Sequence, residues 1–123
     1  MSVTFGSFIK EKRIKNNYLL KDVAEIVGIS AVYQSCIETG KRHAPSYKVL
    51  VGLGKALKLD EDEFSEMLDL AVKSKDEKTV AYDIADYIND NSYIRDAIRF
   101  SIKHNVSESD WEAFYNNIKV KYD

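Results

Sequence analysis

The sequence predicts an all-α protein. Only one of its 123 residues is proline and five are glycine, so few residues interrupt helices. Apolar residues recur at the three- and four-residue spacing of amphipathic helices, and no segment of useful length shows the two-residue period of a strand. The composition, 45% hydrophobic and 31% charged, is that of a globular domain. A chain of this length can bury a core without a metal or disulfide.

The first two expected helices are short and end at clear signals. The first begins at Phe5 and ends at Asn16-Asn17. The second spans Leu20 to Val27, where apolar residues repeat at i, i+3, i+4 and i+7. Gly28 follows and readily adopts the left-handed conformation that closes a helix. Together these segments predict a helix, a tight turn and the start of another helix.

The third and fourth expected helices follow after short connections. Ser30 is a favourable N-cap for the third helix, which ends at Gly40. Pro45-Ser46 opens the fourth, in which Gly52 and Gly54 each cost up to about 1 kcal/mol relative to alanine. We therefore expect a neighbouring element to approach the backbone closely at these two glycines.

Acidic residues at Asp60–Glu63 suit the positive end of a fifth helix. Beyond them, residues 73–78 form the one linker-like stretch. Three further amphipathic segments follow, and Ser107–Asp110 has capping-box spacing before the last of them. Their apolar stripes are Val80, Ile84, Tyr87 and Ile88; Ile94, Ala97, Ile98 and Ile102; and Trp111, Phe114, Tyr115, Ile118 and Tyr122.

Charge divides the chain into two parts. Residues 1–58 have ten Lys/Arg and four Asp/Glu, whereas residues 59–123 have eight and sixteen. Blocks of opposite sign indicate two working surfaces, with the basic one facing an anionic partner. The overall net charge of −2 argues against a purely electrostatic nucleic-acid binder.

Several classes of protein are not expected. The single cysteine, Cys36, excludes an internal disulfide and a cysteine-rich zinc site, and no metal or cofactor is expected. There is no glycine-rich phosphate loop, no His-x-x-x-His pair and no nucleophile beside a base, so we do not expect an enzyme. Residues 1–4 lack a signal pattern and no apolar run approaches a membrane span. We therefore expect a cytoplasmic protein without membrane contact.

Two short helices joined by a glycine-containing turn form a helix-turn-helix unit. The residues sharpen this interpretation: Lys21-Asp-Val-Ala-Glu-Ile-Val-Gly-Ile-Ser30, then Tyr33, Ile37-Glu38, Gly40-Lys41-Arg42 and Pro45-Ser46. This pattern resembles the Cro/phage-repressor (Xre) family over about 55 residues. The resemblance implies a five-helix, lambda-repressor-like DNA-binding domain followed by a C-terminal helical extension. The segment from Asp83 to Ile118 is similar, more weakly, to helical tails of some members.

The resemblance also implies site residues. Helix 30–38 would be the recognition helix in the major groove, the loop after it would lie on phosphates, and Arg13 and Glu38 would form a buried structural ion pair. His43 is either a phosphate neighbour or a solvated loop residue. The implied DNA-binding residues are Lys21, Ser30, Ala31, Val32, Tyr33, Gln34, Cys36, Thr39, Lys41, Arg42 and His43.

The recognition helix departs from the family pattern. Base-reading positions usually hold residues that make bidentate bonds to purines, but here Ala31, Val32 and Cys36 offer mainly apolar contact, for instance with thymine methyl groups. Gln34 stands where members have an apolar core residue, and Leu20 where many have a phosphate-binding glutamine. Two explanations stay open. A rotated helix could present Tyr33 and Gln34 to the groove, or the helix reads DNA weakly or binds a protein.

The expected organisation is a DNA-binding domain at residues 1–72, a linker at 73–78 and a C-terminal helical region at 79–123. The C-terminal helices could pack on the first domain, on each other or on a second copy, and we expect them to form a dimer interface or an effector-binding face. The expected function is a transcriptional regulator, in particular a repressor that binds double-stranded operator DNA as a homodimer. The alternative is a protein-interaction module of antitoxin or anti-repressor type.

Overall fold

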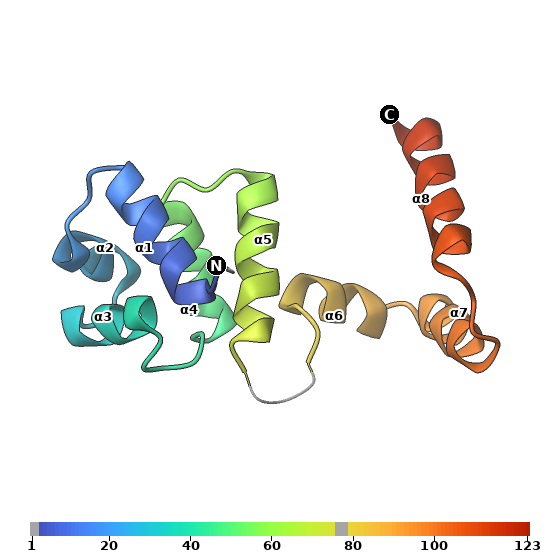
Figure 1. The fold of residues 1–123 in the computed structure, drawn as a ribbon, viewed down its shortest axis with the longest axis horizontal. Helices are drawn as coiled ribbons and strands as arrows, with labels where there is room; N and C mark the ends of the chain where they lie inside the picture. Colours follow the sequence, from blue (N-terminus) through green and yellow to red (C-terminus); the bar gives the residue numbers. More distant parts are fainter. Residues whose placement is uncertain (1–2, 76–78) are drawn as a thin grey trace. The chain divides into compact units, whose positions relative to one another are not determined.

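The computed structural model describes residues 3–75 and 79–123, and within them the chain is entirely helical, as predicted (Figure 1). The described residues form two compact units, and the boundary between them along the sequence lies between Ile84 and Ala85. The helices are α1 (Phe5–Lys15), α2 (Leu20–Val27), α3 (Ala31–Thr39), α4 (Tyr47–Ala56), α5 (Glu61–Lys73), α6 (Tyr82–Asn89), α7 (Ser92–Lys103) and α8 (Glu108–Tyr122).

The ends of the first helices follow the signals in the sequence. Asn16 caps the C-terminal end of α1. Gly28 and Gly40 close α2 and α3 with φ of 88° and 80°, a left-handed conformation that costs glycine no Cβ clash. Ser30 caps α3 by accepting a hydrogen bond from the backbone N–H of Tyr33 over 3.0 Å. The predicted boundaries of α2 and α3 are therefore confirmed.

The start of α5 is closed by a reciprocal pair of hydrogen bonds. Asp60 Oδ1 accepts from the N–H of Glu63 over 2.8 Å, and Glu63 Oε1 accepts from the N–H of Asp60 over 3.0 Å. This capping box satisfies two backbone donors that the helix itself leaves unpaired. Asp60 and Glu63 thus have a structural role as the helix cap, and Glu61 and Asp62 lie in the first turn of α5.

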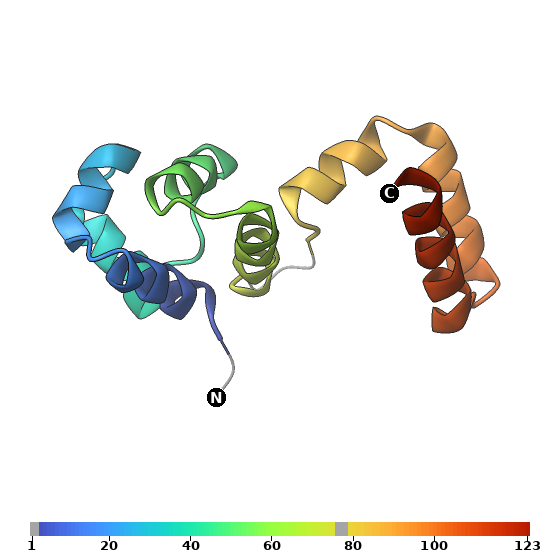
Figure 2. The ribbon, with the colours of Figure 1, turned by 90° about the horizontal axis from the view of Figure 1, so that it is seen from above.

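The core of the first unit is built by all five of the first helices. α2 and the start of α3 lie together at the end of this unit opposite α5, in both views (Figures 1 and 2). Burying apolar side chains from each helix provides the main stabilisation of such a bundle. The largest fully buried apolar residues are Ile9, Val23, Ile37, Leu50, Leu53, Leu57, Met67 and Leu68.

Gly54 and Gly6 allow close helix packing. A Cβ on Gly54 would lie 2.8 Å from Cδ2 of Phe64, so the expected close approach is confirmed there. Gly52 is less constrained, because its Cβ would lie 3.4 Å from Cγ1 of Val27. The tightest place is Gly6, whose Cβ would lie 2.5 Å from the carbonyl oxygen of Ile37. Gly6 therefore lets α1 pack directly on the backbone of α3.

The first unit extends further along the chain than the expected boundary at residue 72. Helix α5 continues through Lys73, and Ser74 caps it. Ala81 is buried with the core, and the ring of Tyr82 packs on Tyr47 with centroids 5.2 Å apart. The expected linker therefore begins inside α5, because its charged residues are also good helix formers; its remaining part, 76–78, lies outside the described residues.

The second unit, residues 85–123, contains most of α6 together with α7 and α8. Arg95 Nη1 donates to the carbonyl oxygens of Ile88 and Asn89 at the end of α6, over 3.0 and 2.5 Å. The expected N-cap of the last helix is present, since Ser107 Oγ accepts from the N–H of Asp110 over 3.2 Å. None of the residues of this unit is buried. The three helices alone thus leave their apolar stripes partly exposed, although Ile88, Ile94 and Ile98 are half-buried.

Candidate nucleic-acid interface

The connection between α2 and α3 has the geometry of a helix-turn-helix. The N–H of Gly28 donates to the carbonyl of Ala24 over 2.9 Å, and Ile29 packs half-buried against the core. Val23 of α2 and Ile37 of α3 are buried in that same core. These contacts hold the two helices at a fixed angle, so that one face of α3 points away from the core.

The exposed face of α3 is largely apolar. Ala31, Val32 and Thr39 are exposed, and Val32 keeps 74% of its surface accessible. The Thr39 hydroxyl donates to the carbonyl of Ser35 over 2.9 Å. Among the expected recognition residues, Tyr33 and Cys36 are half-buried. The helix therefore offers methyl groups rather than amide or guanidinium groups along its outer face.

A shallow hollow brings together several of the expected site residues. It is lined by Ser30, Val32, Tyr33, Cys36 and Arg42. The guanidinium carbon of Arg42 lies 5.9 Å from the centroid of the Tyr33 ring, within the range of a cation–π contact. The loop after α3 and the outer face of α3 thus form one continuous surface with a cationic edge.

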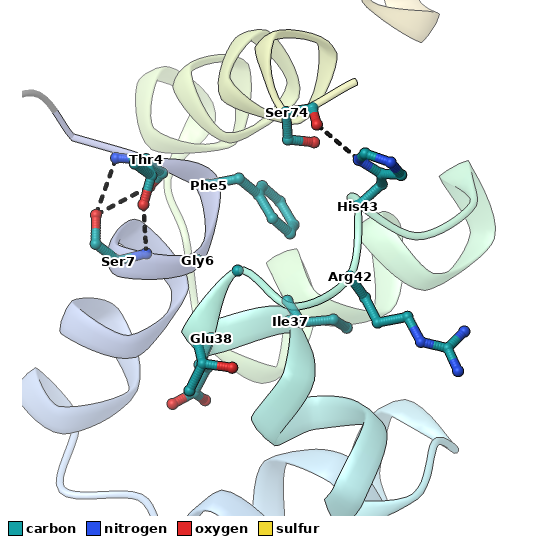
Figure 3. A pocket seen from close by; sticks show the side chains of 11 residues that line it. Thr4, Phe5, Gly6, Ser7, Ile37, Glu38, Arg42, His43 and Ser74 are labelled. Carbon is teal, nitrogen blue, oxygen red and sulfur yellow. Dashed lines mark hydrogen bonds between the residues drawn. The ribbon is translucent and has the colours of Figure 1, made fainter. Parts of the chain in front are cut away.

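The loop after α3 is fastened to the end of α5. His43 Nδ1 lies 2.8 Å from the carbonyl oxygen of Ser74 and must be the donor, because a carbonyl only accepts. The Ser74 hydroxyl accepts from the N–H of Ala44 over 3.1 Å. Figure 3 shows the His43 bond at the rim of a pocket, with the Arg42 side chain extending away from it. His43 is exposed, and this hydrogen bond holds its ring beside the end of α5. Both interpretations of the residue, a phosphate neighbour or a solvated loop residue, stay open.

The two basic residues before His43 are exposed. Lys41 and Arg42 both lie on the loop surface, next to the hollow that Arg42 helps to line. Lys21 is exposed in the first turn of α2 and does not line that hollow. Exposed cations beside a helix face are the groups that neutralise phosphates.

The expectation that Gln34 contacts DNA is wrong. Gln34 is 0% exposed, and its Nε2 donates to Oε2 of Glu38 over 2.9 Å. Positions 34, 37 and 38 lie on one face of α3, since residues three and four apart share a helix face, and this face is buried. The rotated recognition helix that would present Gln34 to the groove is excluded.

Arg13 and Glu38 form an ion pair between α1 and α3. Arg13 Nε donates to Glu38 Oε2 and Arg13 Nη2 to Glu38 Oε1, both over 2.9 Å. Arg13 Nη1 also donates to the carbonyl of Tyr18 over 2.9 Å. The pair is largely screened from water, with side-chain exposures of 13% and 3%. It positions α3 and is directed away from the outer face of that helix.

A second ion pair was not expected from the sequence. Lys12 Nζ lies 2.6 Å from Glu63 Oε2 and connects α1 to α5. This hydrogen bond raises the pKa of Lys12 and lowers the pKa of Glu63. Because 51 positions separate the two residues, no local pattern signals their contact.

Other kinds of site find little support in the described part of the chain. Within residues 3–75 and 79–123, no three His, Cys, Asp or Glu side chains lie close enough together to hold a metal ion. The helices described there include none that is long and apolar enough to cross a membrane.

The fold and the α2–α3 geometry define a DNA-binding helix-turn-helix domain. Residues 9–64 match the helix-turn-helix family model, and this part of the chain belongs to the Cro/C1-type helix-turn-helix domains found in Xre-family regulators. The chain is therefore a DNA-binding helix-turn-helix regulator. No curated protein and no solved structure gives a significant match to the chain.

Proposed function

We propose that this chain is a sequence-specific transcriptional repressor that binds its operator as a homodimer. The observation that supports this most is the surface formed by the outer face of α3 and the Lys41-Arg42 loop. On it, exposed methyl groups adjoin exposed cations. Such a surface can insert a helix into the major groove while neighbouring cations bind the phosphates.

Base reading is assigned to α3. The exposed Val32 and Ala31 lie in its first turn, the part of a recognition helix that usually contacts base edges. Methyl groups distinguish thymine through its C5-methyl group, so we expect T-containing steps in the operator. Tyr33 and Cys36 flank the same hollow.

Phosphate binding is assigned to three cations. Lys41 and Arg42 follow α3, and Lys21 lies in the first turn of α2. The net charge of residues 1–58 is +6, which supports attraction of this part of the chain to DNA. The acidic remainder of the chain would be repelled from the phosphates and would favour one orientation on the duplex.

A homodimer is proposed because DNA-binding helix-turn-helix proteins commonly use two recognition helices on half-sites about 34 Å apart. The unburied apolar stripes of residues 85–123 supply a surface for such association. Repression would follow from operator occupancy that blocks transcription.

Selection from a random DNA duplex library tests this function. We expect an enriched sequence with two related half-sites whose centres are about 10 base pairs apart, and repression of a reporter gene placed behind it. A control selection with the Lys41→Ala/Arg42→Ala variant should recover less DNA in each round but enrich the same sequence, because phosphate contacts add affinity without reading bases. Selection by the wild-type protein that also enriches nothing would contradict sequence-specific recognition.

One observation favours a second candidate, a protein-interaction module. The outer face of α3 presents Val32 with 74% of its surface exposed, and exposed apolar groups also suit a protein partner. In that case a Val32→Asp variant would lose a protein partner recovered by affinity capture, whereas DNA binding would be weak and independent of sequence in both proteins.

A further inference from the structure

Helix α8 has one apolar stripe and one isolated apolar residue on the opposite side. Trp111, Tyr115, Ile118 and Tyr122 are spaced by four, three and four residues, which places them on one face at the spacing of a helix-pairing seam. Val120 is two residues from both Ile118 and Tyr122. Two residues correspond to a rotation of about 200° around a helix, so Val120 lies on the opposite side from the stripe. It is also the most exposed apolar residue of α8, at 82%.

The stripe is only partly covered within its own unit. Its four side chains keep between 39% and 73% of their surface exposed, although Trp111 packs edge-on against Phe114 with ring centroids 6.1 Å apart. A continuous row of aromatic and branched side chains left in water is costly, so a partner that buries it gains free energy.

The charges along α8 indicate what that partner is. The first half of the helix has Glu108, Asp110 and Glu112, and the second half has Lys119 and Lys121. A second α8 running antiparallel would therefore bring acidic residues opposite basic residues at both ends. A parallel copy would place like charges together instead.

We infer that two copies of this chain associate through α8, packed antiparallel across a two-fold axis between Tyr115 and Ile118. In this arrangement Trp111 of one copy packs near Tyr122 of the other, and one Glu112–Lys119 pair forms on either side of the two-fold axis. A two-fold axis requires such a self-complementary surface. This inference specifies the interface of the homodimer in the proposed function. It rests on the proposed function only for the biological purpose of the dimer.

Sedimentation of the full chain without DNA tests the apolar seam. The wild-type chain should sediment at twice its 14.1 kDa mass at micromolar concentration. Ile118→Asp, which places a charge in the seam, should weaken dimerisation by about 100-fold or more. Val120→Asp introduces the same side chain on the outer face and should change it by less than about threefold, because exposed substitutions cost little. Circular dichroism establishes that both variants keep the helix content of the wild-type chain.

Charge reversal tests the antiparallel direction. Glu112→Lys alone should weaken dimerisation about tenfold, because two Lys–Lys contacts replace two Glu–Lys pairs. The double variant Glu112→Lys/Lys119→Glu should recover it to within about threefold. A 1:1 mixture of the Glu112→Lys and Lys119→Glu chains should form heterodimers more readily than either chain forms homodimers.

Three outcomes would overturn the inference: a monomeric wild-type chain at about 100 μM, which is about 100 times a micromolar dissociation constant; equal effects of the Ile118 and Val120 variants; or no effect of Glu112→Lys. None of these measurements involves DNA. A dimer that shows no sequence preference for DNA would contradict the proposed function and leave the α8 interface in place.

Discussion

Arg13 and Glu38 join α1 to α3 through two hydrogen bonds of 2.9 Å, and Gln34 donates to the same carboxylate. The carboxylate thus receives donors from two helices at the buried side of α3. Gly6 also lets α1 approach the backbone of Ile37 and Glu38. Contacts with α1 therefore fix the position of the second half of α3.

Breaking this ion pair should cost stability. Arg13→Met leaves the buried carboxylate of Glu38 without its main partner, and we expect a loss of about 3 kcal/mol in the free energy of unfolding. Urea unfolding followed by circular dichroism measures it. The double variant Arg13→Met/Glu38→Leu should lose less than Arg13→Met alone, since no buried charge then remains. A loss below about 1 kcal/mol in Arg13→Met would mean that the pair is effectively solvated.

Gln34 should matter for packing rather than for DNA recognition. Its Oε1 is buried without a hydrogen-bond donor among the described residues, so Gln34→Met removes a desolvated acceptor together with one donor to Glu38. We expect the free energy of unfolding to change by less than about 1 kcal/mol, with unchanged DNA affinity. A clear loss of sequence preference in a normally stable Gln34→Met protein would mean that the side chain reaches the bases.

Gly6 and Gly52 form a matched pair for testing helix packing. Gly6→Ala places a methyl group against a backbone carbonyl and should destabilise the fold by about 2 kcal/mol or more. Gly52→Ala meets Val27 at van der Waals distances, 3.4 Å from Cγ1 and 3.9 Å from Cα and Cβ, and should be neutral or stabilising by up to about 1 kcal/mol. Thermal unfolding of the two variants measures this difference in stability. Equal melting temperatures would contradict the close α1–α3 contact.

The ion pair between Lys12 and Glu63 should give a pH-dependent contribution to stability. The hydrogen bond from Lys12 lowers the pKa of Glu63, so its contribution is present above the ordinary glutamate pKa of about 4.3 and disappears as the pH falls through the lowered value. Wild-type protein should therefore exceed Glu63→Gln in stability at pH 7, and the difference should shrink as the pH falls below the ordinary glutamate pKa. Urea unfolding midpoints of the two proteins from neutral to acidic pH measure this stability difference. A difference that does not shrink as the pH falls would exclude the Lys12–Glu63 pair as its cause.

The same pair predicts the opposite behaviour in alkali. The hydrogen bond to Glu63 raises the pKa of Lys12, so that contribution is present below the ordinary lysine pKa of about 10.4 and is lost as the pH rises through the raised value.

Lys41 and Arg42 should contribute to DNA affinity without setting sequence preference. Each Ala substitution should reduce the slope of log affinity against log salt by about 0.9, the value for one phosphate contact. Lys103→Ala is the control, since Lys103 lies on α7, outside the residues that match the family. Salt titrations of the three variants test this, and slopes equal to that of the wild type would remove the loop from the interface.

The sequence predicts most of the first unit because its signals are local. Gly28, Gly40 and Ser30 each determine a helix end through their own backbone or side-chain chemistry, and apolar periodicity identifies the buried faces. Gln34 shows the limit of local signals: its polar side chain predicts an exposed position, whereas the structure buries it and pairs it with Glu38. The contact of Tyr82 with Tyr47 and the Lys12–Glu63 pair join distant segments, so only the three-dimensional structure reveals them.

The most direct test of sequence-specific DNA binding is fluorescence anisotropy with DNA from around the protein's own gene, compared with a shuffled duplex over a range of salt concentrations. We expect the native duplex to bind at least about 1000-fold more tightly than the shuffled one, with a salt slope corresponding to several phosphate contacts. Equal, weak binding of both duplexes, together with no enriched sequence in the library selection, would contradict a DNA-reading role for α3.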